Sequence, residues 1–310
     1  MRLMRADAGP ARPSQPGSDY GVLGGIVLRL AATFLFMVMT LFVRLASFAA
    51  PVGQIVFHRS AWALLPIVLY LVWRRQFPAA LATRRPIGHV RRSLYGCAAM
   101  FFSFLSLAYL PLALAAALGF LAPLLAVPVA AIALRERPGW LIGAAALAGF
   151  GGILLMLAPA FTGPALDAGT LIGVAAGLAM AATTVAAKVE IKTLTATERP
   201  GTIAFYFALV CAAGGLATWP LGWASVGETA LAWLIGAGLA GGLAHICMTE
   251  AIARAPISTL APFEYTAMIW AVLFDQVVFG VLPTAVSLAG ALVIVAAAGA
   301  VAFRERRAPA

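Results

Sequence analysis

The stretch that decides the fold is LPLALAAALGFLAPLLAVPVAAIAL at 110–134, together with its counterpart APISTLAPFEYTAMIWAVLFDQVVFG at 255–280. Each begins with a proline in second position and continues as an apolar run of bilayer length, since a spanning helix needs about 20 predominantly apolar residues. At the same offset, Pro138 behind the first run matches Pro283 behind the second. These two runs predict a membrane protein whose second half repeats the first.

Composition points to the same class. Hydrophobic residues make up 63% of the chain, charged residues only 10%, and mean hydropathy is +0.99. A soluble domain carries roughly a quarter charged residues, so this inventory does not cover a water-exposed surface. Because the apolar runs are long and rich in Ala, Leu and Gly, they favour helices over the ~10-residue alternating strands of a membrane barrel.

We therefore predict an all-α polytopic membrane protein with ten transmembrane helices. The expected domains are a disordered cytoplasmic tail at 1–20, a five-helix repeat at 21–158, a second at 169–303, and a basic cytoplasmic tail at 304–310. Five is an odd number, so the two repeats enter the membrane in opposite orientations and surround a central cavity. The predicted spans are 22–43, 52–73, 93–110, 112–134, 138–158, 169–187, 201–221, 229–250, 257–280 and 284–303.

The basic residues give the orientation. Of 21 Lys and Arg residues, 18 fall on segments that face one side when the spans are counted this way, and only Arg44 falls on the other. This asymmetry follows the positive-inside rule and predicts an inner-membrane protein with both termini cytoplasmic. The net charge of +10 is then explained by topology and by attraction to anionic lipids, so we expect no nucleic-acid partner.

Three short segments carry a resemblance to a known family. They are PVGQIVFHRS at 51–60, LRERP at 134–138 and APFEYT at 261–266. Through them, and over nearly the whole chain, the sequence resembles the EamA branch of the drug/metabolite transporter superfamily. The resemblance implies two five-helix repeats and transport of a small solute. Relatives of this kind include amino-acid and metabolite exporters, riboflavin importers and S-adenosylmethionine importers, so the resemblance does not name the cargo.

Ionisable residues inside the spans are the candidate site, because charges at membrane depth usually face a cavity or a partner. Arg59 on the second span and Asp275 on the ninth lie at similar depth from the outer face, and we expect them to form a pair. The alternative is a buried ion pair that only fixes helix packing. Arg29 is expected to extend to the interface, and Lys188 to lie at a helix end without a special role.

His245 and Glu264 form a second candidate pair at comparable depth from the inner face. A buried carboxyl group and an imidazole titrate in a range useful for proton transfer, so the pair is a candidate for proton coupling; the alternative is a polar contact between neighbouring helices. Glu264 and Asp275 also project from nearly one face of a continuous ninth helix. That face should line the cavity.

Aromatic side chains provide possible stacking surfaces for a planar cargo. Tyr265 is grouped with the substrate-binding candidates, and Tyr109, Phe120 and Trp270 are possible cavity aromatics. The ordinary alternative for each is core packing or interfacial anchoring.

Enzyme and metal chemistry find no support in the sequence. The histidines are scattered without a zinc-binding pair, and no nucleotide-binding loop occurs. The cysteines Cys97, Cys211 and Cys247 all fall inside predicted spans, which indicates packing rather than disulfides or a metal site. We therefore expect no catalytic residues, no metal and no cofactor.

The sequence thus predicts a secondary carrier for a small organic solute, with export of amino acids or related metabolites as the preferred function. Proton coupling is a further expectation. The acids on the ninth span favour a cargo with a cationic group. Import of a planar, vitamin-like or nucleoside-like metabolite is the alternative that the aromatics favour, and a non-transporting scaffold or sensor is the alternative of another class. Cargo, direction and oligomeric state stay open.

Overall fold

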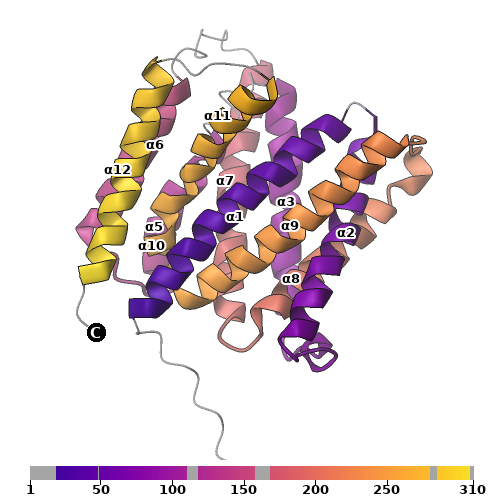
Figure 1. The fold of residues 1–310 in the computed structure, drawn as a ribbon, viewed down its shortest axis with the longest axis horizontal. Coiled ribbons are helices and arrows are strands. Elements are labelled where there is room, and N and C mark those ends of the chain that lie inside the picture. The colour runs from indigo at the N-terminus through magenta and orange to yellow at the C-terminus, as the bar shows by residue number, and fades with distance from the viewer. Residues whose placement is uncertain (1–18, 48, 110–117, 158–167, 280–284, 308–310) are drawn as a thin grey trace, which may run out of the picture.

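The computed structural model describes residues 19–47, 49–109, 118–157, 168–279 and 285–307 (Figure 1). Within these ranges the chain is helical and contains no strand. The α-helices are α1 (Asp19–Ala46), α2 (Val52–Trp73), α3 (Pro86–Tyr109), α5 (Leu121–Ala133), α6 (Trp140–Leu157), α7 (Ala168–Leu194), α8 (Pro200–Leu216), α9 (Glu228–Arg254), α10 (Ile257–Glu264), α11 (Thr266–Phe279) and α12 (Ala285–Arg307), with short 3₁₀ turns η1 (Ala79–Leu81) and η3 (Trp219–Leu221).

Six stretches in the described part are long and apolar enough to cross a membrane, judged by length and composition. They are Gly21–Val43, Val52–Trp73, Ala168–Leu194, Pro200–Leu221, Glu228–Arg254 and Ile257–Val278. Many large apolar side chains on the outside of the bundle are exposed, among them Ile132 and Trp140. In water such a surface would aggregate, whereas lipid covers it. The predicted all-helical membrane architecture is confirmed at this level, and the count of ten spans stays a prediction.

Helices from the first half of the chain pack mainly against helices from the second half. The most extensive contacts join α1 to α9, α3 to α7, α6 to α12, and α2 to both α8 and α9; Figure 1 shows α1 and α9 side by side on a common diagonal. Small residues permit these close approaches. A Cβ on Gly242 of α9 would come within 2.6 Å of the Ala63 carbonyl oxygen on α2, and one on Gly152 of α6 within 2.8 Å of the Gly290 oxygen on α12.

Helix boundaries differ from the predicted spans where a helix continues past its apolar part. α3 begins at Pro86 rather than at residue 93, and α7 ends at Leu194 rather than at residue 187. Both extensions carry charged residues that hydropathy places in loops. The predicted junction at 110–112 lies outside the described residues.

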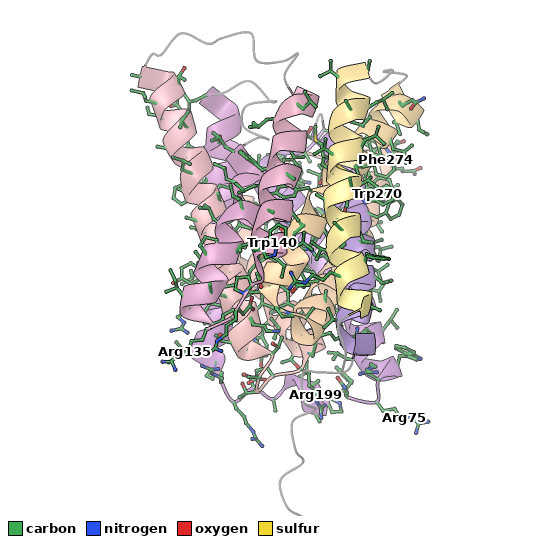
Figure 2. All side chains as sticks on the ribbon, turned by 90° about the vertical axis from the view of Figure 1, so that its left-hand side faces the viewer. Arg75, Arg135, Trp140, Arg199, Trp270 and Phe274 are labelled. Carbon is green, nitrogen blue, oxygen red and sulfur yellow. The ribbon has the colours of Figure 1, made fainter. Side chains whose placement is uncertain are left out.

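One end of the bundle collects basic side chains. Arg75, Arg135 and Arg199 lie there (Figure 2), and so do the start of α1 and the end of α12 (Figure 1). We call it the basic end.

Candidate functional site

The ninth predicted span is interrupted in its middle. α10 ends at Glu264, α11 begins at Thr266, and Tyr265 lies between them. Pro262 lies inside α10 and lacks a backbone N–H, so one helical hydrogen bond is missing just before the break. Just after the break, the Thr266 hydroxyl donates to the Phe263 carbonyl at 2.7 Å. This interruption contradicts the expectation of a continuous ninth helix that presents Glu264 and Asp275 on one face.

Glu264 lies at the end of α10 and binds two cations from other helices. One carboxylate oxygen is 2.8 Å from Arg29 Nη2 on α1, and the other is 2.5 Å from Lys188 Nζ on α7. The side chain of Glu264 is 12% exposed, and those of Arg29 and Lys188 are each 7% exposed. We call Arg29, Lys188 and Glu264 the carboxylate triad. With one anion for two cations, its formal charge is +1.

The triad corrects two expectations from the sequence. Arg29 does not extend to the interface, because a buried carboxylate within reach offers a stronger partner than distant water. Lys188 is not at a helix end, because α7 continues to Leu194 and so carries the amine into the bundle.

A second group of basic residues lies among α2, α3, α8 and α9. Arg59 Nη2 is 3.4 Å from His245 Nε2, and Arg59 Nη1 is 3.2 Å from Met100 Sδ. The Arg92 guanidinium stacks on the ring of Phe207 at 3.5 Å, and this ring packs edge-on against His245 with centroids 4.8 Å apart. We call Arg59, Arg92 and His245 the arginine cluster.

Arg92 is the most enclosed member of the cluster. Its residue is 3% exposed, and its Nε and Nη1 atoms are buried without a hydrogen-bond partner. Gly96, one turn later on α3, leaves the space for this conformation, because a Cβ there would lie 2.8 Å from Arg92 Nη1 and 2.7 Å from Phe207. Hydropathy places Arg92 just before the predicted third span at 93–110, so hydropathy alone does not indicate a buried charge there. Gly96, one turn after Arg92, was the feature of the sequence that could have indicated this burial.

The predicted pair of His245 and Glu264 does not occur in the structure, and the pair of Arg59 and Asp275 stays a prediction. His245 contacts Arg59 rather than Glu264, since the break after Glu264 turns that carboxylate toward α1 and α7. The side chain of Asp275 lies outside the described part of the structure, although its backbone belongs to α11. The described contacts of Arg59 are on α3 and α9.

Two cysteines lie beside the arginine cluster. Cys97 Sγ on α3 is 3.5 Å from Cys211 Sγ on α8, and both thiols are free, as is Cys247. At that separation the sulfur atoms touch without a bond, since a disulfide is near 2.05 Å. This agrees with the predicted packing role.

The candidate aromatics lie in different places. Tyr265 is 0% exposed and packs against Phe120, with ring centroids 6.4 Å apart. Trp270 packs edge-on against Phe34 at 5.3 Å, and its Nε1 donates to the Thr33 hydroxyl at 3.3 Å. Tyr109 is exposed. The four rings therefore do not form one stacking surface, and Tyr265 has no face open to a ligand.

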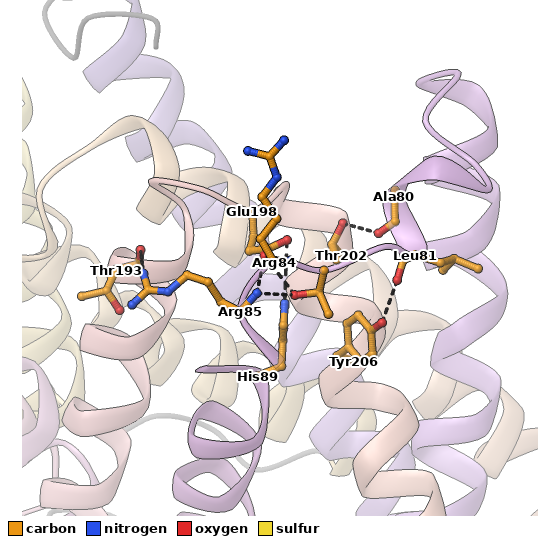
Figure 3. A network of polar contacts seen from close by, with 10 residues as sticks. Ala80, Leu81, Arg84, Arg85, His89, Thr193, Glu198, Thr202 and Tyr206 are labelled. Carbon is orange, nitrogen blue, oxygen red and sulfur yellow. Dashed lines mark hydrogen bonds and ion pairs between the residues drawn. The ribbon is translucent and has the colours of Figure 1, made fainter. Parts of the chain in front are cut away.

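At the basic end, Glu198 joins two loops (Figure 3). Its Oε1 accepts hydrogen bonds from the Thr83 hydroxyl at 2.9 Å and from the backbone N–H groups of Arg84 and Arg85 at 2.8 and 3.1 Å. His89 lies next to it, 4.0 Å from Oε2 and ahead of the predicted third span. Burial lowers the pKa of His89 more than Glu198 raises it, and the Arg92 charge lowers it further.

Glu136 forms a similar connection between the halves. Its carboxylate accepts hydrogen bonds from the backbone N–H groups of Ile257 and Ser258 at 3.0 and 3.1 Å, and from the Ser258 hydroxyl at 2.6 Å. An anion at a helix N-terminus satisfies unpaired N–H groups and complements the helix dipole. Nearby, Lys192 donates to the carbonyl groups of Ile252 and Ala255 at the end of α9. The contacts of Glu136 and Glu198 thus link the two halves at the basic end.

A groove of about 610 Å³ lies on α1, α10, α11 and α12. Its lining is almost wholly apolar, with Leu30, Phe263 and Trp270 among its residues. The groove offers apolar contact area but almost no polar groups that could recognise a solute. The chemistry available to a solute therefore lies in the triad and the arginine cluster. Among the described residues no three His, Cys, Asp or Glu side chains gather in a way that would hold a metal.

An apolar helical bundle with charged groups enclosed between its helices is the architecture of an integral membrane transporter. Residues 23–158 match the model of the EamA-like transporter family. The resemblance stated from the sequence is confirmed by this match over residues 23–158. The protein is a membrane transporter and not an enzyme.

Two curated relatives match over most of their length. They are the pseudopaline exporters CntI of Pseudomonas aeruginosa strains UCBPP-PA14 and PAO1, each 28% identical over 281 residues that cover 88% of this chain and 94% of the relative. A solved crystal structure shares the fold with a TM-score of 0.80 and 21% identity, over 91% of this chain and 98% of that one. At that identity the likeness concerns the fold alone.

Proposed function

We propose that this protein is a secondary carrier that exports a small organic metabolite across the inner membrane. The observation that carries the proposal is the presence of charged side chains enclosed at membrane depth, the triad and the arginine cluster. Such charges are costly in a bilayer protein and are found mainly where a solute or ion is handled. Export as the direction rests on the similarity to two proteins that bear the name of exporters.

The proposal includes two inverted five-helix repeats, 21–158 and 169–303. The helix contacts support this arrangement. In this repeat α1 is equivalent to α7, and α3 is equivalent to α9. A contact of α1 with α9 should therefore be accompanied by a contact of α7 with α3, and both are present. Contacts of α2 with α8, α5 with α10, and α6 with α12 join helices that would be equivalent.

We also propose that the basic end faces the cytoplasm, with both termini there. The clustering of Arg75, Arg135 and Arg199 at the end where α1 begins and α12 ends supports this orientation through the positive-inside rule. The contacts of Glu136 and Glu198 link the two halves at this end, which supports a conformation in which the halves are held together on the cytoplasmic side. Alternating access then requires these contacts to break.

Proton coupling stays part of the proposal in a changed form. Glu264 is a carboxylate enclosed between the helices, and it is held by Arg29 and Lys188. A proton can replace these cations only when α1, α7 and α10 separate. Coupling would therefore occur during the conformational change rather than in the closed state.

The test is efflux from proteoliposomes loaded with a mixed panel of amino acids, carboxylates, phosphates and polyamines, with and without a pH gradient. Release of at least one class above protein-free liposomes is the expected result. Glu264→Gln should lower that release, while Arg137→Gln, an exposed residue at the basic end, serves as the control. Release of no solute by a folded protein would contradict the carrier, and release that ignores the pH gradient would contradict proton coupling alone.

A further inference from the structure

The arginine cluster has no acid. Within the described part of the chain, neither Arg59 nor Arg92 has a carboxylate within ion-pair distance. Their contacts are Met100, His245 and Phe207, and the thiols of Cys97 and Cys211 lie beside them. Arg29, Lys188, Arg91 and Arg254 each have a carboxylate partner.

The neighbours of the cluster compensate charge only weakly. A thioether is a weak acceptor, and an aromatic face attracts a guanidinium far less than a carboxylate does. His245 adds no negative charge, and its Nδ1 is buried without a hydrogen-bond partner. Removing two guanidinium groups from water without counter-charge is unfavourable. The cluster is therefore incomplete in the form that the structure shows.

An anion would complete it. Two guanidinium groups offer planar pairs of donors that match a carboxylate or a phosphate group. Arg92 Nε and Nη1 are buried and free to donate. Arg59 is only partly enclosed, unlike Arg92, so an incoming group would meet it first.

We propose that Arg59 and Arg92, with His245 beside them, bind the anionic group of the transported solute, so that the substrate class is a carboxylate- or phosphate-bearing metabolite. This inference rests on the proposed transport function and deepens it. It replaces the expectation of a cargo recognised by its cationic group, since the acid of the ninth span that the structure describes, Glu264, is already bound by two cations. Amino acids remain within the class through their carboxylate.

The first experiment measures binding without transport. The purified protein is unfolded by heat in sodium acetate, sodium phosphate or sodium chloride at matched ionic strength and pH. Acetate or phosphate should raise the midpoint over chloride by about 2–3 °C in the wild type, because a ligand that binds only the folded state stabilises it. The Arg59→Met/Arg92→Met double variant should lose this difference.

Arg91→Met is the matched control, because Arg91 is the neighbour of Arg92 on α3 but is exposed and paired with Glu190. It should keep the anion effect. Arg59→Lys keeps a charge and should keep part of it, which covers the case in which the double variant does not fold. A larger shift in acetate than in phosphate assigns a carboxylate, and the reverse assigns a phosphate. An equal shift in wild type and double variant, or no shift in the wild type, overturns the inference.

The second experiment is efflux from proteoliposomes loaded with L-glutamate, citrate, glycerol 3-phosphate, L-leucine and putrescine. We expect release of one or more of the anions, reduced about tenfold or more in Arg59→Met and in Arg92→Met and unchanged in Arg91→Met. Release of putrescine alone overturns the inference and leaves the carrier intact. An anion effect on unfolding without any release supports the site and contradicts the carrier, so the two failures are distinguishable.

Discussion

The carboxylate triad and the arginine cluster are both enclosed in the bundle and both contain two basic side chains, yet only the triad contains an acid. In the triad, Glu264 contacts both cations at 2.5–2.8 Å. In the cluster, Arg59 and Arg92 contact a thioether, an imidazole and a phenyl ring. A group that contains its own counter-charge is suited to holding helices together, and a group that lacks one is suited to accepting it from outside.

The difference separates a group that holds the helices of this conformation together from a group that binds the solute. Breaking the triad should leave cations stranded and should destabilise the fold. Changing the cluster should remove the binding site and leave the fold as stable as before.

The largest expected effect follows from Glu264→Gln. The variant leaves Arg29 and Lys188 buried without an anion, and loss of one partner of a buried ion pair costs about 3–5 kcal/mol. A lowered unfolding temperature and poorer yield in detergent are expected. The Glu264→Gln/Lys188→Met double variant should recover part of the loss. Wild-type stability of the single variant would place the triad among weakly stabilising contacts.

Arg92→Met should have the next largest effect, on transport rather than on folding. Solute release should fall about tenfold, which corresponds to about 1.4 kcal/mol. The unfolding midpoint should stay constant or rise, because the variant removes an uncompensated buried charge and keeps apolar packing against Phe207. Efflux and thermal unfolding on the same preparation check this. A large drop in stability with normal efflux would reverse the assignment.

Lys188→Met should destabilise the fold less than Glu264→Gln, although both variants change the same contact. The variant retains the neutral Arg29–Glu264 pair at 2.8 Å and removes only the surplus cation. We expect a loss of about 1 kcal/mol or less, since it removes a charge-assisted hydrogen bond together with an excess buried charge. If unfolding experiments find the two variants equally destabilised, Lys188 rather than Arg29 is the main partner of Glu264.

Arg91→Met should have the smallest effect. The Arg91 side chain is 51% exposed and pairs with Glu190 at 2.9 Å. Exposed pairs contribute about 0–1 kcal/mol, so stability and efflux should remain close to wild type. A strong effect on efflux would show that basic charge at this end of α3 matters as such, and would weaken the case for Arg92.

Hydropathy predicts most of the helices because spanning a bilayer demands long apolar runs. The predicted second span, 52–73, has the same limits as α2. Hydropathy does not predict the helix end where a helix continues beyond its apolar run, as α7 does between residues 187 and 194. It also fails at Tyr265, where Pro262 was visible in the sequence but the position of the break was not.

Partners of buried charges are harder to predict than helices. Similar depth suggested His245 for Glu264, but tilt and rotation of the helices decide which side chains meet. The break after Glu264 turns its carboxylate toward α1 and α7, and the extended α7 supplies Lys188. Burial of Arg92 depends on the absent side chain of Gly96 and on the face of Phe207. The contact of Arg92 with Phe207 joins α3 to α8, two helices that are distant in sequence.

The missing acid of the arginine cluster also has an electrical consequence. A cell interior is negative relative to the outside, and moving one elementary charge through 100 mV involves about 2.3 kcal/mol. A solute that reaches Arg59 and Arg92 as an anion is driven outward by this voltage, whereas a cationic solute would be drawn back. An exporter built around such a cluster can take its driving force from the membrane potential itself, and the rate of efflux should then follow the voltage imposed on the vesicle.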